Sequence, residues 1–428
     1  MKVHFGPATS VAAVFLFAGS VGAQQPGASG GAVRLTRQQA IAEALAHSNQ
    51  LDISREQAYQ ARARRVSGIG VPDPALSAAY DQISGPVSFS GAPSKPVSLG
   101  LSIPFPDKFR LNTKIGNADV RNFELNHQLQ QQLVAFTTSV AYDSLLVAQR
   151  HYNEQQETLQ LAQDFLTRTQ ARFNAGSAPK LDVFRAQVDV AQSQNDLVDA
   201  QRAVTVAQAS LNRQLNRPVS AAIAPADSLD VPPALPDSAS IEGLALSSRP
   251  ELRQIQAQRA GAAAATTLAR EFWSPDLTFS VQRDYATTGA KPLFTTGIAL
   301  PLPIFYPIHS RGDIAVAQHF ERELAATDRD VRSQIALDVR QAYATASSAV
   351  RQVVFLRDQL LPATREAFRV ANASYGLGGA SALDVLSARR DLIDAQAKLS
   401  DALAAANTAY ADLQRALGVP LTQIGTTP

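Results

Sequence analysis

Cysteine is missing from this chain of 428 residues, and methionine and tryptophan occur once each. The absence of cysteine excludes disulfides, thiolate metal sites, cysteine nucleophiles and a lipidated N-terminal cysteine. The formal net charge is only +2, so no strong field of one sign points to nucleic acid or to an acidic partner. Beyond residue 23, no apolar run reaches the length of a transmembrane helix.

The N-terminus predicts export. Lys2 and His4 precede an apolar run over 11–18, and small residues over 21–23 fit a cleavage site. This pattern is typical of a secretory signal peptide and too short for a membrane span, whereas a buried N-terminal strand is the alternative. We predict a signal peptide over 1–23 and a flexible N-terminus over 24–33. If the exported protein crosses a membrane, it must do so with strands.

An internal repeat organises the rest of the chain. When residues 173–218 are shifted by 202 positions, 18 of the 46 residues are identical to those of 375–420. A looser match continues upstream, where VPDPALSAAY (71–80) corresponds to SPDLTFSVQ (274–282). Such self-similarity indicates a duplicated structural unit.

Each half of the repeat has the order helix, two strands, long helix, helix. The first repeat covers 34–217, with strands at about 74–83 and 96–104 and a helical hairpin at about 112–217 whose tip is 173–180. The second covers 241–420, with strands at about 276–285 and 293–302 and a hairpin at about 312–418 whose tip is 375–382. A Pro- and Ala-rich connector over 218–240 joins them, and 421–428 form a C-terminal tail.

The hairpin helices carry apolar residues with a period of seven. The sequence therefore predicts a mainly helical protein with coiled-coil seams and a small β part. Pro362 should break or bend the long helix of the second hairpin, because proline removes a backbone donor. The residues of the two seams are Val183, Val190, Leu197, Val204 and Leu211, then Val385, Leu392, Leu399, Ala406 and Leu413.

The four predicted strands alternate apolar with small polar residues, as in VSLGLSI (97–103). Each has, with its flanks, the length of a tilted strand that crosses a bilayer. A soluble sheet with one buried face would alternate in the same way, but the export signal and the very long helices favour the membrane. Four strands cannot close a barrel, so copies must share one. Two chains would give 8 strands and three would give 12.

Aromatic residues gather where the predicted strands meet helices. This is where an aromatic belt is expected if the strands cross a membrane. The residues are Phe105, Phe272, Trp273, Phe305 and Tyr306.

The two tips are turns between helices that require glycine. Gly176 and Gly378 occupy matching positions of the repeat, and Asp182 and Asp384 fall in the first turn of the helix that follows each tip. An acidic residue there interacts favourably with the helix N-terminus. If copies surround a pore, each aspartate also forms a ring of carboxylates that favours cations.

Three stretches make the chain resemble the outer membrane efflux proteins of the TolC family. They are RFNAG followed by LDV (172–183), YGLGGASALDVLSA (375–388) and PLPIFYPIHSRGDIAVAQ (301–318). The resemblance implies a homotrimer with a 12-stranded outer-membrane β-barrel, continued by a periplasmic α-helical barrel. PDPALS (72–77) is similar to the cation-efflux branch of this family.

The same resemblance implies function, partners and gate residues. It implies an outer-membrane exit duct, set in outer-membrane lipid, that receives substrates from a periplasmic adaptor and an inner-membrane pump of the resistance–nodulation–division type. Asp384 matches a ring aspartate, while Ser387 stands where the second ring aspartate would be. Tyr375 and Asp182 match two residues of the family's gate, but its arginine position is Ala380.

Other motifs in the sequence do not support an enzyme. GASGG (27–31) and SAPK (177–180) match catalytic patterns without their partner motifs, and the histidines lack metal-ligand spacing. We expect no catalytic residue, no cofactor, no firm metal site and no nucleic-acid partner. A type I secretion channel for polypeptides is one alternative function. An exported coiled-coil structural or adhesion protein without a pore is another.

Overall fold

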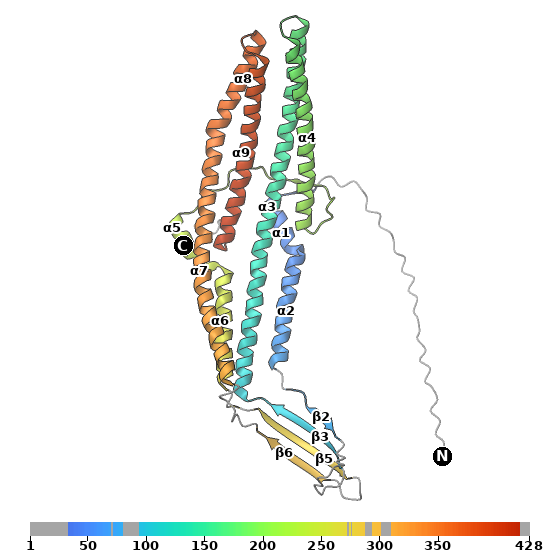
Figure 1. Cartoon of the computed structure of the whole chain (residues 1–428), viewed down its shortest axis with the longest axis vertical. Coiled ribbons are helices and arrows are strands. Elements are labelled where there is room, and N and C mark those ends of the chain that lie inside the picture. The colour runs from blue at the N-terminus through green and yellow to red at the C-terminus, as the bar shows by residue number, and fades with distance from the viewer. Residues whose placement is uncertain are drawn as a thin grey trace, which may run out of the picture.

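The computed structural model describes residues 33–69, 72–79, 94–271, 274, 276–286, 293–300 and 310–419. A four-stranded sheet lies at one end of an elongated molecule, and the tips of two helical hairpins lie at the other (Figure 1). The expected signal peptide, most of the flexible N-terminus and the C-terminal tail lie outside the described residues.

The order helix, helix, two strands, long helix, helix occurs twice in the described residues. In the first half they are β1 (Val33–Leu35), α1 (Arg37–His47), α2 (Asn49–Ile69), β2 (Ala75–Ala78), β3 (Ser94–Ile103), α3 (Pro106–Asn174), α4 (Lys180–Gln214) and β4 (Ile223–Pro225). In the second half they are α5 (Ser238–Ser248), α6 (Pro250–Arg270), β5 (Leu277–Ala286), β6 (Leu293–Ala299), α7 (Ser310–Phe355), a π-helical turn (Leu356–Leu360), α8 (Leu361–Leu377) and α9 (Ala382–Leu417).

The sheet is antiparallel throughout, in the order β2-β3-β5-β6, so that the two repeats meet at the pair of β3 with β5. Leu101 lies opposite Phe279, which lies opposite Ile298, whereas Gly100 and Gly297 flank Ser280. Since cross-strand partners project to the same side, one face of the sheet is apolar and the other carries small polar residues. The apolar residues are largely exposed in this single chain.

The hairpin helices are far longer than a globular core requires. At about 1.5 Å per residue, the 69 residues of α3 extend roughly 100 Å. The second hairpin differs at Pro362, which cannot donate to the carbonyl oxygen of Asp358 four residues earlier. Instead of ending, the helix passes through the π-helical turn between α7 and α8.

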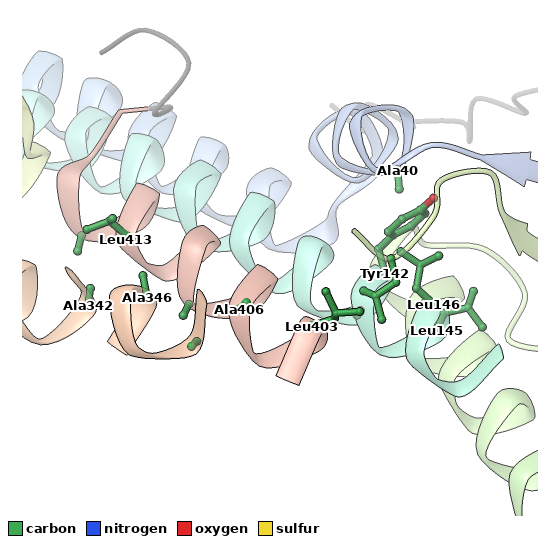
Figure 2. Packing of buried hydrophobic residues seen from close by; sticks show 14 of the residues in the cluster. Ala40, Tyr142, Leu145, Leu146, Ala342, Ala346, Leu403, Ala406 and Leu413 are labelled. Carbon is green, nitrogen blue, oxygen red and sulfur yellow. The ribbon is translucent and has the colours of Figure 1, made fainter. Parts of the chain in front are cut away.

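The hairpins are held by small apolar side chains. Figure 2 shows Ala342 and Ala346 of α7 near Ala406 and Leu413 of α9, and all four belong to one buried cluster. In α9 all five seam residues are buried, whereas in α4 only Val183 and Leu211 are buried. The seam of α9 is more buried because α9 packs against α3, α7 and α8, while α4 packs mainly against α3.

A short parallel pair of strands fastens the chain start to the middle of the hairpins. β1 pairs with β4, which lies within the predicted connector, and we call β1, α1 and β4 the strap. The hydroxyl of Tyr142 on α3 donates to the carbonyl oxygen of Leu35 at 2.8 Å and to the carboxylate of Asp227 at 3.0 Å. Tyr142 and Ala40 of α1 lie together in the core there (Figure 2). The strap therefore covers the Tyr142 side of α3.

Candidate functional site

The two tips are tight turns that require glycine. Gly176 has a φ of 74° and Gly378 a φ of 81°, in the left-handed region where a side chain is strained. The N–H of Gly378 donates to the carbonyl oxygen of Tyr375 at 3.1 Å, and that of Gly176 donates to the carbonyl oxygen of Phe173 at 2.9 Å. The turns end α8 and α3 and reverse the chain at the far end of the molecule (Figure 1).

Asp384 lies in the first turn of α9 and completes a capping box. Its backbone N–H donates to the hydroxyl of Ser381 at 3.2 Å, and its carboxylate accepts from the backbone N–H of Ser381 at 2.9 Å. The backbone and hydroxyl hydrogen bonds from Ser381 lower the pKa of Asp384 below its usual value. The side chain is exposed, so Asp384 is a charged group available at the tip.

Asp182, its counterpart in the first repeat, has a different environment. The residue is 8% exposed, and its carboxylate lies 3.6 Å from the guanidinium of Arg185 one turn later. The same position in the repeat therefore carries an exposed carboxylate on α9 and a covered, paired one on α4.

Tyr375 is buried between the two hairpins. Its hydroxyl donates to the hydroxyl of Thr169 on α3 at 3.3 Å, and its ring centroid lies 5.3 Å from that of Phe165. The sequence brings Tyr375 to the tip, but within one chain its hydrogen-bond partner comes from α3. A Tyr375–Asp182 contact would require the hydroxyl of Tyr375 to leave Thr169, and it stays a prediction for the assembled protein.

Arg172 joins the first tip to the second, although the sequence patterns did not single it out. Its guanidinium stacks over the Tyr375 ring at 4.4 Å from the centroid and donates to the carbonyl oxygen of Tyr375. It also donates to the carbonyl oxygen of Ser177 in its own turn at 3.3 Å. One guanidinium thus holds both turns.

A second pair of charges joins the hairpins farther from the tips. The guanidinium of Arg389 on α9, which is 4% exposed, forms an ion pair with Asp189 on α4. Burial raises the pKa of Asp189, and the charge of Arg389 opposes this rise. The signal in the sequence is a charge on an apolar stripe, because Arg389 follows Val385 and precedes Leu392 with helical spacing.

The remaining predicted residues lie near the sheet. Phe105 is the residue before α3 and its side chain is exposed at the junction of sheet and helix. Phe272, Trp273, Phe305 and Tyr306 lie outside the described residues. The aromatic belt therefore stays a prediction.

Among the described residues, no group of three or more His, Cys, Asp or Glu is placed to hold a metal ion. None of the helices in the described ranges is long and apolar enough to cross a membrane.

The chain is similar to outer-membrane efflux proteins over most of its length. The family model described as "Outer membrane efflux protein" matches residues 35–217 and 243–419, one match for each repeat. The cobalt-zinc-cadmium resistance protein CzcC of Cupriavidus metallidurans is 24% identical over 65% of this chain and 66% of its own length. The pyoverdine export outer membrane protein OpmQ of Pseudomonas aeruginosa is 28% identical over 60% of this chain, and the match spans about half (55%) of OpmQ.

A solved structure has the same fold. The outer membrane protein VceC of Vibrio cholerae superposes with a TM-score of 0.74 at 19% identity, covering 90% of this chain and 96% of VceC. At this level of identity the similarity concerns the fold, in which long helical hairpins continue from a small sheet.

Proposed function

The chain belongs to the outer membrane efflux protein family, and we propose that it is the exit duct of a tripartite efflux system. In this role it conducts substrates passively from a periplasmic adaptor and an inner-membrane pump to the outside. The protein resides in the outer membrane, and the proposal places its helices in the periplasm.

One observation carries the proposal, namely a sheet with one apolar face attached to helices roughly 100 Å long. Within the described residues, β2 and β6 form the edges of this sheet. Lipid cannot satisfy open edges, so the sheet needs further strands to stand in a membrane. Three copies of four strands give 12, enough for a barrel with an open bore, and the hairpins of three copies would continue that barrel as a helical tube.

The partners follow from this arrangement. A passive duct supplies no energy, so it needs a pump in the inner membrane and an adaptor that joins the pump to the tips. Its resemblance to the cation-efflux branch favours a pump of the resistance–nodulation–division type. We propose transport without catalysis and without a cofactor.

Deletion of the gene tests the proposed function. A deletion strain should become more susceptible to at least one class of compound in a panel of metal salts, siderophores and drugs, because its exit route is lost. The intact gene should restore resistance. Unchanged susceptibility to the whole panel would contradict efflux, and loss of a secreted polypeptide from the medium would favour the type I alternative.

The tips are the proposed periplasmic entrance of the duct. In a trimer, Asp384 would form a ring of three exposed carboxylates, with Ser387 at the place of the family's second ring. We propose that the contacts of Arg172 and Arg389 between the hairpins hold this entrance closed, taking the place of the arginine that is Ala380 here.

Asp384→Asn should weaken the block of the duct by multivalent cations applied at the tip side. The substitution removes the negative charge from all three members of the ring, so the ring no longer attracts a cation. We expect the block to weaken roughly tenfold or more, which single-channel recording measures as a higher blocking concentration. Asp394→Asn, at an exposed position farther along α9, is the matched control. Equal block of Asp384→Asn and the unsubstituted protein would refute the ring.

A further inference from the structure

His151 lies between two carboxylates that come from different hairpins. Its Nε2 is 3.0 Å from a carboxylate oxygen of Asp401 on α9, and its Nδ1 is 3.3 Å from a carboxylate oxygen of Glu154 on its own helix α3. The two hairpins are therefore connected through this imidazole, far from the tip contacts of Arg172.

Among the charged groups around this contact, His151 is the one whose charge changes near neutral pH. Glu154 accepts hydrogen bonds from Arg150 on α3 at 3.1 Å and from Ser400 on α9 at 2.8 Å. At a similar level of α4, Asp199 and Arg202 are 3.2 Å apart and pair with each other. Glu154 thus keeps partners when His151 is neutral, whereas Asp401 loses its cation.

The hydrogen bond to Glu154 raises the pKa of His151 above its ordinary value. Burial opposes this rise, and the hydrogen bond to Asp401 adds to it. Although burial alone would raise the pKa of Glu154, its bonds from His151, Ser400 and Arg150 lower it. A raised histidine pKa means that the folded state binds the proton more tightly than the unfolded state. The stabilisation is complete below about pH 6.5 and is lost as the pH rises through the folded-state pKa.

His151 also lies on a particular side of α3. It follows Tyr142 by nine residues, which places it about 180° around the helix. The strap covers the side of α3 that carries Tyr142. If this side faced the bore of a helical tube, the strap would obstruct the bore. If the protein is the duct proposed above, His151 and the 70% exposed side chain of Asp401 therefore face the water of the bore.

We propose that His151 is a pH-sensitive clamp, which holds the two hairpins of one chain together more tightly when it is protonated than when it is neutral. The clamp lies about six turns from the tip end of α3, so its weakening at high pH lets the hairpin of α8 and α9 move more freely against that of α3 and α4. Only its position in the bore rests on the proposed function, because the clamp itself lies within one chain.

Spin-label distances test the clamp on the full-length protein in detergent or nanodiscs. The chain has no cysteine, so Gln187→Cys on α4 and Ala373→Cys on α8 introduce one exposed label on each hairpin. The distance distribution should be narrow at pH 5.5 and broader at pH 8.5, with a midpoint above about 6.5. With His151→Gln or Asp401→Asn added, this pH response should disappear.

His127→Gln is the matched control, because His127 is also on α3 but bonds to Ser54 on α2 and to Gln131. It should keep the pH response. The clamp is overturned if the doubly labelled protein that keeps His151 shows no pH response in its label distances. It is also overturned if His151→Gln shows the same response. Failure of the duct proposal would appear elsewhere, as a protein that responds to pH but does not conduct.

Discussion

Arg389→Met is expected to raise the conductance of the reconstituted duct roughly tenfold. Arg389 is buried and paired with Asp189, so the substitution removes an ion pair between the two hairpins and leaves a carboxylate without its cation. Breaking a fully buried ion pair costs about 3–5 kcal/mol. The cost is smaller here, because the side chain of Asp189 is partly exposed. Even about 1.4 kcal/mol shifts the balance of closed and open tips tenfold.

Two further variants separate a latch from a general loss of stability. Arg369→Met removes an exposed pair with Glu366 on the same helix and should conduct like the unsubstituted protein. Exchange of the charges, with Asp189→Arg and Arg389→Asp together, should restore low conductance. The latch is refuted if Arg389→Met conducts no more than Arg369→Met.

Arg37→Met is expected to lower the thermal unfolding midpoint by roughly 5–10 °C, since it leaves a buried carboxylate without its cation. Arg37 begins α1 and fastens the strap, because its guanidinium contacts Asp143 on α3 and donates to the side-chain oxygen of Asn407 on α9 at 3.2 Å. Asp143 is 1% exposed, so water cannot replace the lost partner. Circular dichroism during heating measures the midpoint.

The same carboxylate predicts how stability depends on pH. Burial raises the pKa of Asp143 to about 6, against the lowering effect of Arg37. The folded state therefore binds a proton more tightly than the unfolded state, and stability falls as the pH rises from about 4 to about 6. About two pKa units correspond to roughly 3 kcal/mol.

Asp143→Asn should remove this contribution to the pH dependence, which a series of melting curves between pH 4 and pH 8 would show. Asp52→Asn is the control, because Asp52 is exposed and pairs with Arg55 within α2. The assignment of the slope to Asp143 is wrong if Asp143→Asn and Asp52→Asn melt with the same pH dependence.

The sequence was most informative about features that repeat. The shift of 202 residues located both tips, and Gly176 and Gly378 have the left-handed backbone that a tight turn requires. The alternation in 97–103 predicted a two-faced sheet because side chains alternate along any strand, whatever its neighbours. Membership in the efflux family followed from the two tip motifs and from the stretch 301–318, and it is confirmed by the family match to both repeats.

Features that depend on lateral packing could not be predicted in this way. Arg389 and Asp189 are 200 positions apart, and no periodicity says which helices will be neighbours. The three-residue strands β1 and β4 are too short to show alternation, and β4 lies in the segment predicted as a connector. Pro362 was expected to break or bend its helix, and the helix does not break there, because it continues through the π-helical turn before Pro362.

Planar-bilayer recording of the purified full-length protein, with its mass in detergent measured by light scattering, tests whether the protein is a trimeric channel. We expect trimers that insert into the bilayer and conduct ions in discrete steps, with more time spent in the open state for Arg389→Met. A soluble monomer without conductance would contradict it and would favour an exported coiled-coil protein without a pore.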